Sequence, residues 1–291
     1  MLQIPVLPTR KPGRPKKNKH IDNPKFFING VVTTPSIPTN RMEFTHYNPS
    51  IFKTIISILK NFNVHIVTFE FNTDYIHIFT KDHTRQVDIS IYIICAYAFK
   101  YYCKSRFCIN IERAHLDKIF TAITSDYTNF GLTSKEADYQ TMISILLGTS
   151  NTLDTYNIDV LTTKPINNTI NDSDYKIRFT IKSQCLKQFT SNSMNLKLFS
   201  IQYYNKQLSF NNIVDNKVGY KRVFNNISVD SNIDDNEFFS VHLPFEFVQA
   251  IAYYKISAFV DIIVNDRTTT FLKQIDSIVM FNITIKNICL I

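Results

Sequence analysis

The sequence predicts an α+β fold of two similar domains, each made of two strand–helix–strand units. Three observations lead to this prediction. Phe and Tyr are abundant, with 24 and 15 copies, whereas Gly occurs 5 times and Trp is absent, and aromatic and β-branched residues favour strands. A short apolar strand that leads directly into an amphipathic helix occurs four times. A polar, Pro-containing segment, residues 162–174, separates the first two occurrences from the last two.

The first 40 residues differ in composition from the rest of the chain. They contain seven of the ten prolines and no periodic apolar pattern, which predicts a flexible extension. Residues 1–25 carry seven Lys and Arg against Asp22 alone, so six of the eight net positive charges lie in this segment. Such a basic segment indicates an affinity for polyanions, while the remaining chain is close to neutral.

Four strand positions recur at similar spacing from residue 41 onward. They are Phe44, Ile109, Phe179 and Val241, separated by 65, 70 and 62 residues. Recurrence at this spacing indicates internal repeats the size of a half-domain. The helices predicted after these strands span residues 48–61, 112–124, 182–192 and 244–255. Further strands are predicted at 64–71, 75–80, 86–97, 142–148, 196–204, 259–264 and 278–285.

Each predicted helix has an apolar stripe and a polar face. In the first helix, Phe52, Ile55 and Leu59 would pack inward, with Lys53 and Lys60 on the opposite side. Asn48 is expected to cap this helix, with Pro49 at its first position. The fourth helix has few cations and carries Glu246. The chain therefore divides into a basic tail (1–40), a first domain (41–161), a connecting loop (162–174) and a second domain (175–291).

No pattern of catalysis or metal binding is present. The five Gly are too scattered for a phosphate-binding loop, and the five Cys and seven His have no metal-ligand spacing. A nuclease that uses Asp172 and Asp174 is the remaining enzymatic interpretation, although carboxylates in polar loops are usually solvated. The chain has no signal-peptide pattern and no apolar run of membrane-spanning length. We therefore expect a soluble intracellular protein that is not an enzyme, with reduced thiols and neither cofactor nor metal.

Two segments of the chain resemble the PCNA family of sliding clamps. RMEFTHYNPSIFKTIISILKNFN (41–63) resembles the strand and helix that open a clamp subunit. LDTYNIDVL (153–161) with TTKPINNTINDSDYKIRF (162–179) resembles the last strand of a first domain, the connecting loop and the next strand. The Gly-Arg-Pro tail, the Arg-x-Glu-Phe strand and the Asn-Pro-x-Ile-Phe-Lys helix start are similar to the asfarvirus type of PCNA-like protein.

The resemblance implies a DNA-clamp (processivity) fold, in which helices line the hole of a homotrimeric ring and sheets lie outside. It places the strand at Asp154–Val160 of one subunit beside the strand at Val218–Asn225 of the next. The expected interface residues are Asp154, Tyr156, Asn157 and Val160 on one side, and Val218, Tyr220 and Arg222 on the other.

A clamp needs weak, sequence-independent contacts with phosphates. The candidates on or beside the helices are Lys53, Lys60, Arg113, Lys118, Lys182, Lys187 and Lys255, and the alternative is an ordinary solvated face. In the tail, KPGRPKK resembles an AT-hook, with Arg10, Lys11, Arg14, Lys16 and Lys17 as candidate DNA contacts. A nuclear localisation signal and a nonspecific DNA tether are the alternatives for this segment.

The resemblance also implies a pocket for partner proteins near the connecting loop. The matching positions are Leu161, Ile166, Ile283 and Ile285, and the alternative for the last two is a place in the core. The function expected is a processivity factor that tethers DNA polymerase and other replication or repair enzymes to double-stranded DNA during viral replication, in the host cytoplasm or nucleus. The alternative is a clamp-fold or AT-hook factor of viral transcription that does not encircle DNA.

Overall fold

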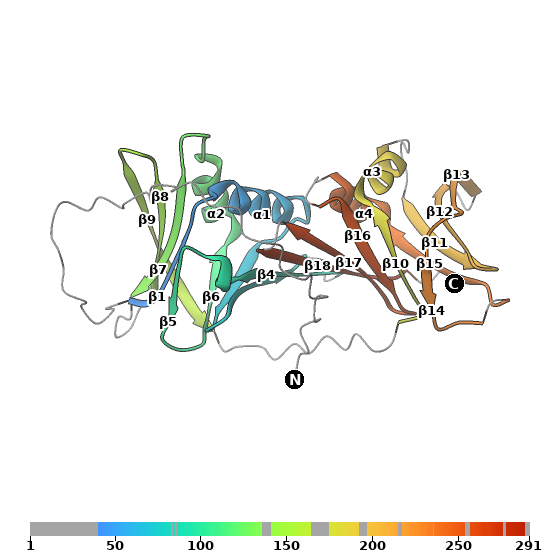
Figure 1. Ribbon diagram of the computed structural model, residues 1–291, viewed down its shortest axis with the longest axis horizontal. Coiled ribbons are helices and arrows are strands. Elements are labelled where there is room, and N and C mark those ends of the chain that lie inside the picture. Colours follow the sequence, from blue (N-terminus) through green and yellow to red (C-terminus); the bar gives the residue numbers. More distant parts are fainter. Residues whose placement is uncertain are drawn as a thin grey trace, which may run out of the picture.

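The computed structural model describes residues 40–82, 84, 86–135, 141–163, 175–191, 197–214, 217–234, 236–253, 257–275 and 278–288. Four helices lie on one side of the sheets (Figure 1). They are α1 (Pro49–Asn61), α2 (Arg113–Thr121), α3 (Ser183–Ser191) and α4 (Phe245–Tyr253). Each falls within a predicted helical range, so the prediction of four helices and of an α+β fold is confirmed.

The first half of the described chain (40–163) contains nine strands and a short 3-10 helix, η1 (Cys95–Tyr97). The strands are β1 (Asn40–His46), β2 (Ile66–Phe71), β3 (Tyr75–Lys81), β4 (Val87–Ile94), β5 (Lys100–Cys103), β6 (Phe107–Glu112), β7 (Asn129–Lys135), β8 (Thr141–Gly148) and β9 (Leu153–Thr163).

The second half (175–288) repeats this order of strands and helices. Its strands are β10 (Ile177–Lys182), β11 (Leu198–Tyr204), β12 (Gln207–Val214), β13 (Lys217–Phe224), β14 (Val229–Ser231), β15 (Phe239–Pro244), β16 (Phe259–Val264), β17 (Thr268–Ile275) and β18 (Val279–Lys286).

The first helix begins where the sequence predicts. The Asn48 side chain accepts a hydrogen bond from Ser50 N at 3.1 Å, and Pro49 occupies the first turn, where its missing N–H costs nothing. The helix ends before Asn63, which has φ 50°. Asn tolerates this left-handed conformation better than most residues with a side chain. The turn between β11 and β12 contains two more residues with positive φ, Asn205 and Lys206.

One continuous sheet crosses both halves of the molecule. Its strand order is β14-β10-β16-β17-β18-β4-β3-β2-β6-β9-β8-β7-β1-β5, and β13-β12-β11-β15 form a separate four-stranded sheet. The halves join where β18 pairs antiparallel with β4, from Val279 opposite Ile93 to Ile285 opposite Val87. The backbone hydrogen-bond ladder therefore passes from one half to the other without a break.

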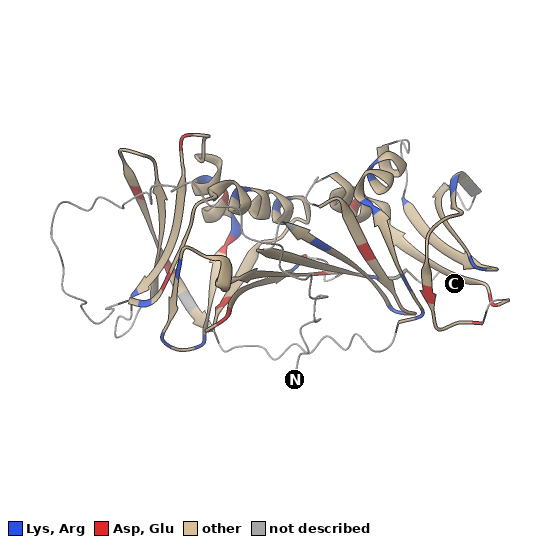
Figure 2. Ribbon diagram, in the orientation of Figure 1, with Lys and Arg blue, Asp and Glu red and all other residues tan. Residues whose placement is uncertain are grey.

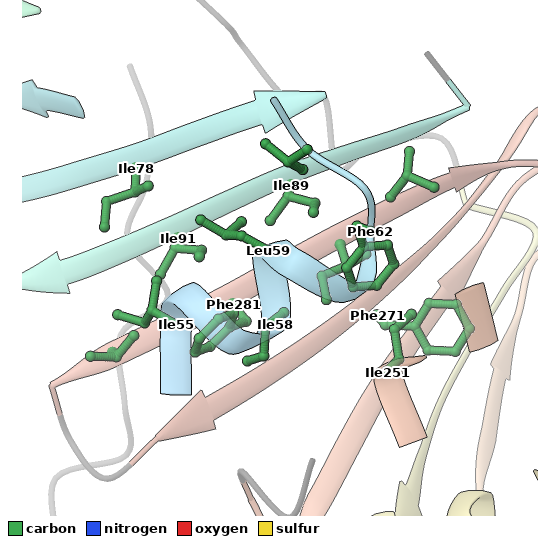
Figure 3. Packing of buried hydrophobic residues seen from close by; sticks show 14 of the residues in the cluster. Ile55, Ile58, Leu59, Phe62, Ile78, Ile89, Ile91, Ile251, Phe271 and Phe281 are labelled. Atoms are coloured by element: carbon green, nitrogen blue, oxygen red, sulfur yellow. The ribbon is translucent and has the colours of Figure 1, made fainter. Parts of the chain in front are cut away.

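The core lies between the helices and the inner faces of the sheets. At the junction of the halves, α1 places Ile55, Ile58 and Leu59 toward Ile91 and Phe281 of the two joining strands (Figure 3). Phe62, just after α1, stacks with Phe247 of α4, with 5.9 Å between ring centroids. The two halves therefore share one core. Burial of each large side chain of this kind stabilises a fold by about 1.5–3 kcal/mol.

Free thiols occur at Cys95, Cys103, Cys108 and Cys185, as expected, while Cys289 lies outside the described residues. Among the helices that the structure describes, none has the length and apolar character needed to cross a membrane.

Candidate nucleic-acid interface and subunit edges

The helices present a polar face away from the sheets, and this face carries exposed lysines from α1 and α2 and a half-buried lysine from α3 (Figure 2). Lys60 lies in the last turn of α1, and Lys118 in the last turn of α2. Both are exposed. Helix C-termini attract cations because their last carbonyl groups carry partial negative charge, which explains why lysines occur at these ends.

Two of the predicted cations also make contacts within the protein. The Lys53 ammonium donates to Ile123 O at 2.7 Å and so ties α1 to the segment after α2. Arg113 Nε donates to Val64 O at 2.6 Å, and its guanidinium pairs with Asp117 one turn later. The charge of Arg113 is thus balanced by a neighbouring carboxylate, which lowers its value as a phosphate contact.

The second half presents fewer cations on this face. Lys187 of α3 is half-buried, with its Nζ 6.0 Å from the ring centroid of Tyr253, an exposed residue of α4. Glu246 and Gln249 of α4 are exposed. Lys255 and the tail candidates Arg10, Lys11, Arg14, Lys16 and Lys17 lie outside the described residues.

Lys182 differs from the expectation. Burial alternates along β10, with Ile181 inward and Thr180 and Lys182 outward. Because successive strand residues point to opposite faces, Lys182 belongs to the face away from the helices. There it lies opposite Phe259 of β16, which is 54% exposed.

Sequence reasoning missed His115, an exposed residue of α2 three positions before Lys118 and therefore on the same helical face.

Several strands at the ends of the sheets pair on one side only among the described residues, and β9 and β13 have the two longest open edges; β5, β14 and β15 have shorter ones. Over Leu153–Val160, β9 pairs with β8 on one side only, before Leu161–Thr163 pair with β6. In the four-stranded sheet, β13 pairs with β12 alone. The two edges lie at opposite ends of the long axis of the molecule (Figure 1).

The predicted interface residues lie on these two edges. On β9, Asp154 is half-buried and accepts a hydrogen bond from the Tyr127 hydroxyl at 2.5 Å, which raises the pKa of Tyr127 to about 12. Tyr156 packs against the core, and the Asn157 side chain accepts from Ser144 Oγ at 2.7 Å. Val160 is buried at 8% exposure.

On β13, two of the predicted residues pack toward α3. The Tyr220 ring lies 5.2 Å from that of Phe189, and Arg222 donates to Cys185 O at 3.4 Å. The Arg222 guanidinium also lies 5.7 Å from the ring centroid of Phe224. The side chain of Val218 lies outside the description.

The prediction of a partner pocket at Ile283 and Ile285 is wrong for these two residues. They are 2% and 0% exposed, because β18 alternates and turns its odd-numbered residues into the core. The outward residues of this strand include Met280, Asn282 and Thr284. Ile166 and the Leu161 side chain lie outside the description.

No group of three or more His, Cys, Asp or Glu side chains placed to hold a metal ion occurs within the described ranges. Asp172 and Asp174 fall in segment 164–174, outside those ranges. The described residues instead provide cations on the helical face, which can bind anions, and open strand edges, which can pair with another strand.

Comparison with known proteins gives one fold and several viral relatives. No family model matches the chain. Proteins described as "Uncharacterized protein E301R", from African swine fever virus isolates of South Africa and Kenya, are 22% identical to it over 297 residues, covering 96% of this chain and 97% of theirs.

Among solved structures, the Proliferating Cellular Nuclear Antigen of Entamoeba histolytica matches with a TM-score of 0.71 and 12% identity, over 86% of this chain and all of that one. The predicted clamp fold is therefore confirmed.

Proposed function

We propose that the chain is the subunit of a homotrimeric sliding clamp that encircles duplex DNA and tethers replication and repair enzymes to it. One observation carries this proposal: the helices gather on one face of an elongated molecule whose two longest open strand edges, on β9 and β13, lie at its opposite ends. Copies joined end to end would place all helices on the same side. A head-to-tail contact of this kind that closes on itself generates a ring.

The open edges supply the reason for assembly. An unpaired strand edge presents backbone N–H and C=O groups that pair readily with another strand. In the proposed ring, Leu153–Val160 of one copy pairs with β13 of the next. We expect Asn157→Pro to block this pairing and to release monomers in light scattering, with circular dichroism as the check that the subunit still folds.

The proposed contact with DNA uses lysines without base recognition. Lys60 and Lys118 carry their charge on long exposed side chains, which suits many weak phosphate contacts that permit sliding. Lys53 and Lys187 add charge to the same face from side chains that also contact Ile123 O and the Tyr253 ring. The basic tail, with Arg10, Lys11, Arg14, Lys16 and Lys17, would act as a nonspecific tether that helps the ring find DNA. Each phosphate contact removed should lower the slope of log affinity against log salt by about 0.9.

A pair of matched variants tests this face. Lys60→Gln should weaken DNA binding and flatten its salt dependence by about one contact's worth, and Lys118→Gln should do the same. Lys81→Gln is the control for each, since it removes one charge from an exposed lysine on the β3–β4 hairpin, paired with Asp88 at 2.9 Å. A loss in the control equal to that in the helical variants would mean that the helical face has no special role in binding.

Since relatives of the chain occur in African swine fever virus, we extend the proposal to viral DNA replication, in the host cytoplasm or nucleus, with a DNA polymerase among the partners. We assign the domains as 41–161 and 175–291, joined by the loop 162–174. Outward residues of β18 and the connecting loop are the places where partners would bind, since Ile283 and Ile285 are inaccessible.

Retention on DNA of different topology tests the function. The full chain and a variant without residues 1–40 would be loaded on nicked circles, and half of each sample would then be linearised. Retention on circles with loss from linear DNA, for both proteins, is the expected result. Equal retention on both forms that disappears with the tail would instead support a non-encircling AT-hook factor.

A further inference from the structure

The chain already contains one contact of the type that the proposed ring needs between subunits. Strand β18 of the second half pairs with β4 of the first, and their inward residues are buried and apolar along the whole junction. At its centre Phe281 lies opposite Ile91, and Figure 3 shows both beneath α1. The internal repeat allows each strand of this junction to be matched to an open edge.

Strand β9 is the counterpart of β18. Asn110 lies three residues before α2 and pairs with Leu161, while His242 lies three residues before α4 and pairs with Ile288. Leu161 therefore corresponds to Ile288, and Asp154, seven residues earlier, corresponds to Phe281. The strand pairing gives the same match. In the first half, directly opposite residues on neighbouring strands are Phe44, Leu132, Ile145 and Tyr156. In the second half they are Phe179, Ile262, Phe271 and Ile283, so Tyr156 corresponds to Ile283.

Strand β13 is the counterpart of β4. Ile109 and Val241, each four residues before a helix, begin two corresponding ladders. The first runs through Ile109, Phe69, Ile78 and Ile91. The second runs through Val241, Ile201, Phe210 and Arg222. Arg222 therefore corresponds to Ile91.

Resting on the proposed ring, we infer that subunits join with Asp154 of one copy directly opposite Arg222 of the next, in the register that β18 and β4 have within the chain. The two residues replace the apolar pair Phe281 and Ile91 by a carboxylate and a guanidinium. The same register sets Tyr156 opposite Tyr220, where the chain has Ile283 opposite Ile89. The partner is a second copy of this chain, and the contact is an ion pair that latches the ring.

The surroundings of both residues suit this role. Asp154 is held by the Tyr127 hydroxyl, and Arg222 is held by Cys185 O and lies against the Phe224 ring, so neither side chain needs to be ordered anew. Both are half-buried before assembly and would lose their remaining water when a second strand covers them. Such a pair favours the correct partner and register, because like charges placed opposite each other repel.

Charge reversal tests the latch in the full-length protein. Asp154→Arg alone and Arg222→Asp alone should each weaken association on the order of a hundredfold, measured by analytical ultracentrifugation. The swapped variant with both changes should recover association. Lys221→Asp is the matched control, since it makes the same charge change one residue away on the exposed outer face of β13, and it should assemble as the parent does.

Cysteine pairs test the register. Tyr156→Cys with Tyr220→Cys should give oxidised oligomers between chains, because directly opposite residues lie about 4.5–5.5 Å apart at Cα. Tyr156→Cys with Phe224→Cys, which is out of register, should not give such oligomers. Each single Cys variant is the control for disulfides that involve the half-exposed Cys103 and Cys185.

The outcomes separate the latch from the ring. If Asn157→Pro releases monomers while both charge reversals keep the parent assembly, the ion pair is wrong and the ring stands. If reversal weakens association and the swap does not restore it, the direct pairing of Asp154 with Arg222 is overturned. If neither Asn157→Pro nor charge reversal alters assembly, the ring through these edges fails together with its latch.

Discussion

Several polar side chains lie in the core of the molecule, and Lys273 is one of them. It is 4% exposed on β17, and its ammonium donates to Ile251 O of α4 at 2.6 Å. The carbonyl groups near the end of a helix carry partial negative charge, which favours a cation there. Removal from water nevertheless dominates and lowers the pKa of Lys273 from 10.5 to about 8.

Lys273 should make the free energy of unfolding change with pH in the alkaline range. In the unfolded chain the group binds its proton up to about pH 10.5, whereas in the folded protein it releases it near pH 8. Because the unfolded state binds more protons between these values, stability should rise with pH across this window, by about 3 kcal/mol in total. Urea unfolding at pH 7.5 and 10 measures the rise, and Lys273→Met should lack it. Equal slopes for the two proteins would exclude Lys273 as the source.

His77 should have the corresponding effect at acid pH. It is 7% exposed, its Nε2 lies 2.6 Å from Ser90 Oγ, and its ring stacks on Tyr92. Burial lowers its pKa to about 4, against the opposing influence of Glu70.

Since the unfolded chain protonates His77 near pH 6.5, stability should fall as pH falls from 6.5 through 4, by about 3 kcal/mol. Thermal unfolding followed by circular dichroism at pH 7 and 4.5 measures the loss. His77→Phe should reduce it, and a variant that loses as much as the parent would contradict this assignment.

At the scale of helices and strands, the sequence predicts helices better than strands. Each helix has an apolar stripe at helical spacing, such as Leu186 and Phe189 of α3, and this spacing is visible in the sequence. Strands β12 and β17 escaped prediction because their inward positions include polar residues. Asn212 and Thr269 are fully buried there, as is Asn211. Alternation of apolar and polar residues cannot reveal a strand whose buried side chains are themselves polar.

The cap of α1 gives a test at this scale. Asn48→Ala removes the acceptor of the Ser50 N–H and should lower the free energy of unfolding by about 1 kcal/mol. Asn48→Asp keeps an acceptor at the same place and should retain most of the stability. Denaturant unfolding of the three proteins measures the difference, and equal losses in Ala and Asp variants would show that the cap is not the cause.

At the scale of the whole molecule, the junction of β4 and β18 makes one folding unit of the two halves. Phe281 is 1% exposed at its centre. Phe281→Ala should cost about 3–5 kcal/mol, as truncations of buried aromatic residues do. Calorimetry should show one lowered transition, because both halves contribute to the core around this ring. Two separate transitions, with only that of the second half lowered, would mean that the halves unfold independently.

The candidate site could be predicted only in part from sequence. Helical spacing suffices to place Lys60 and Lys118 on an exposed face, because a helix repeats regularly. The same spacing puts Asp117 one turn after Arg113, so their ion pair could also have been predicted. It cannot show that Lys182 turns away from the helices, since this depends on which face of β10 points to the core. The opposition of Asp154 and Arg222 depends on the registers of ladders from both halves of the chain, and no local pattern contains it.

The two longest open edges are unlike each other, one formed by β9 and one by β13. Copies that join β9 to β13 have no two-fold axis between them, and every copy in such a ring points the same way around it. The ring would then be directional, with two flat sides that expose different loops. Once threaded on a duplex, it would distinguish one direction of travel from the other, and an enzyme bound to one side would always lead or always follow.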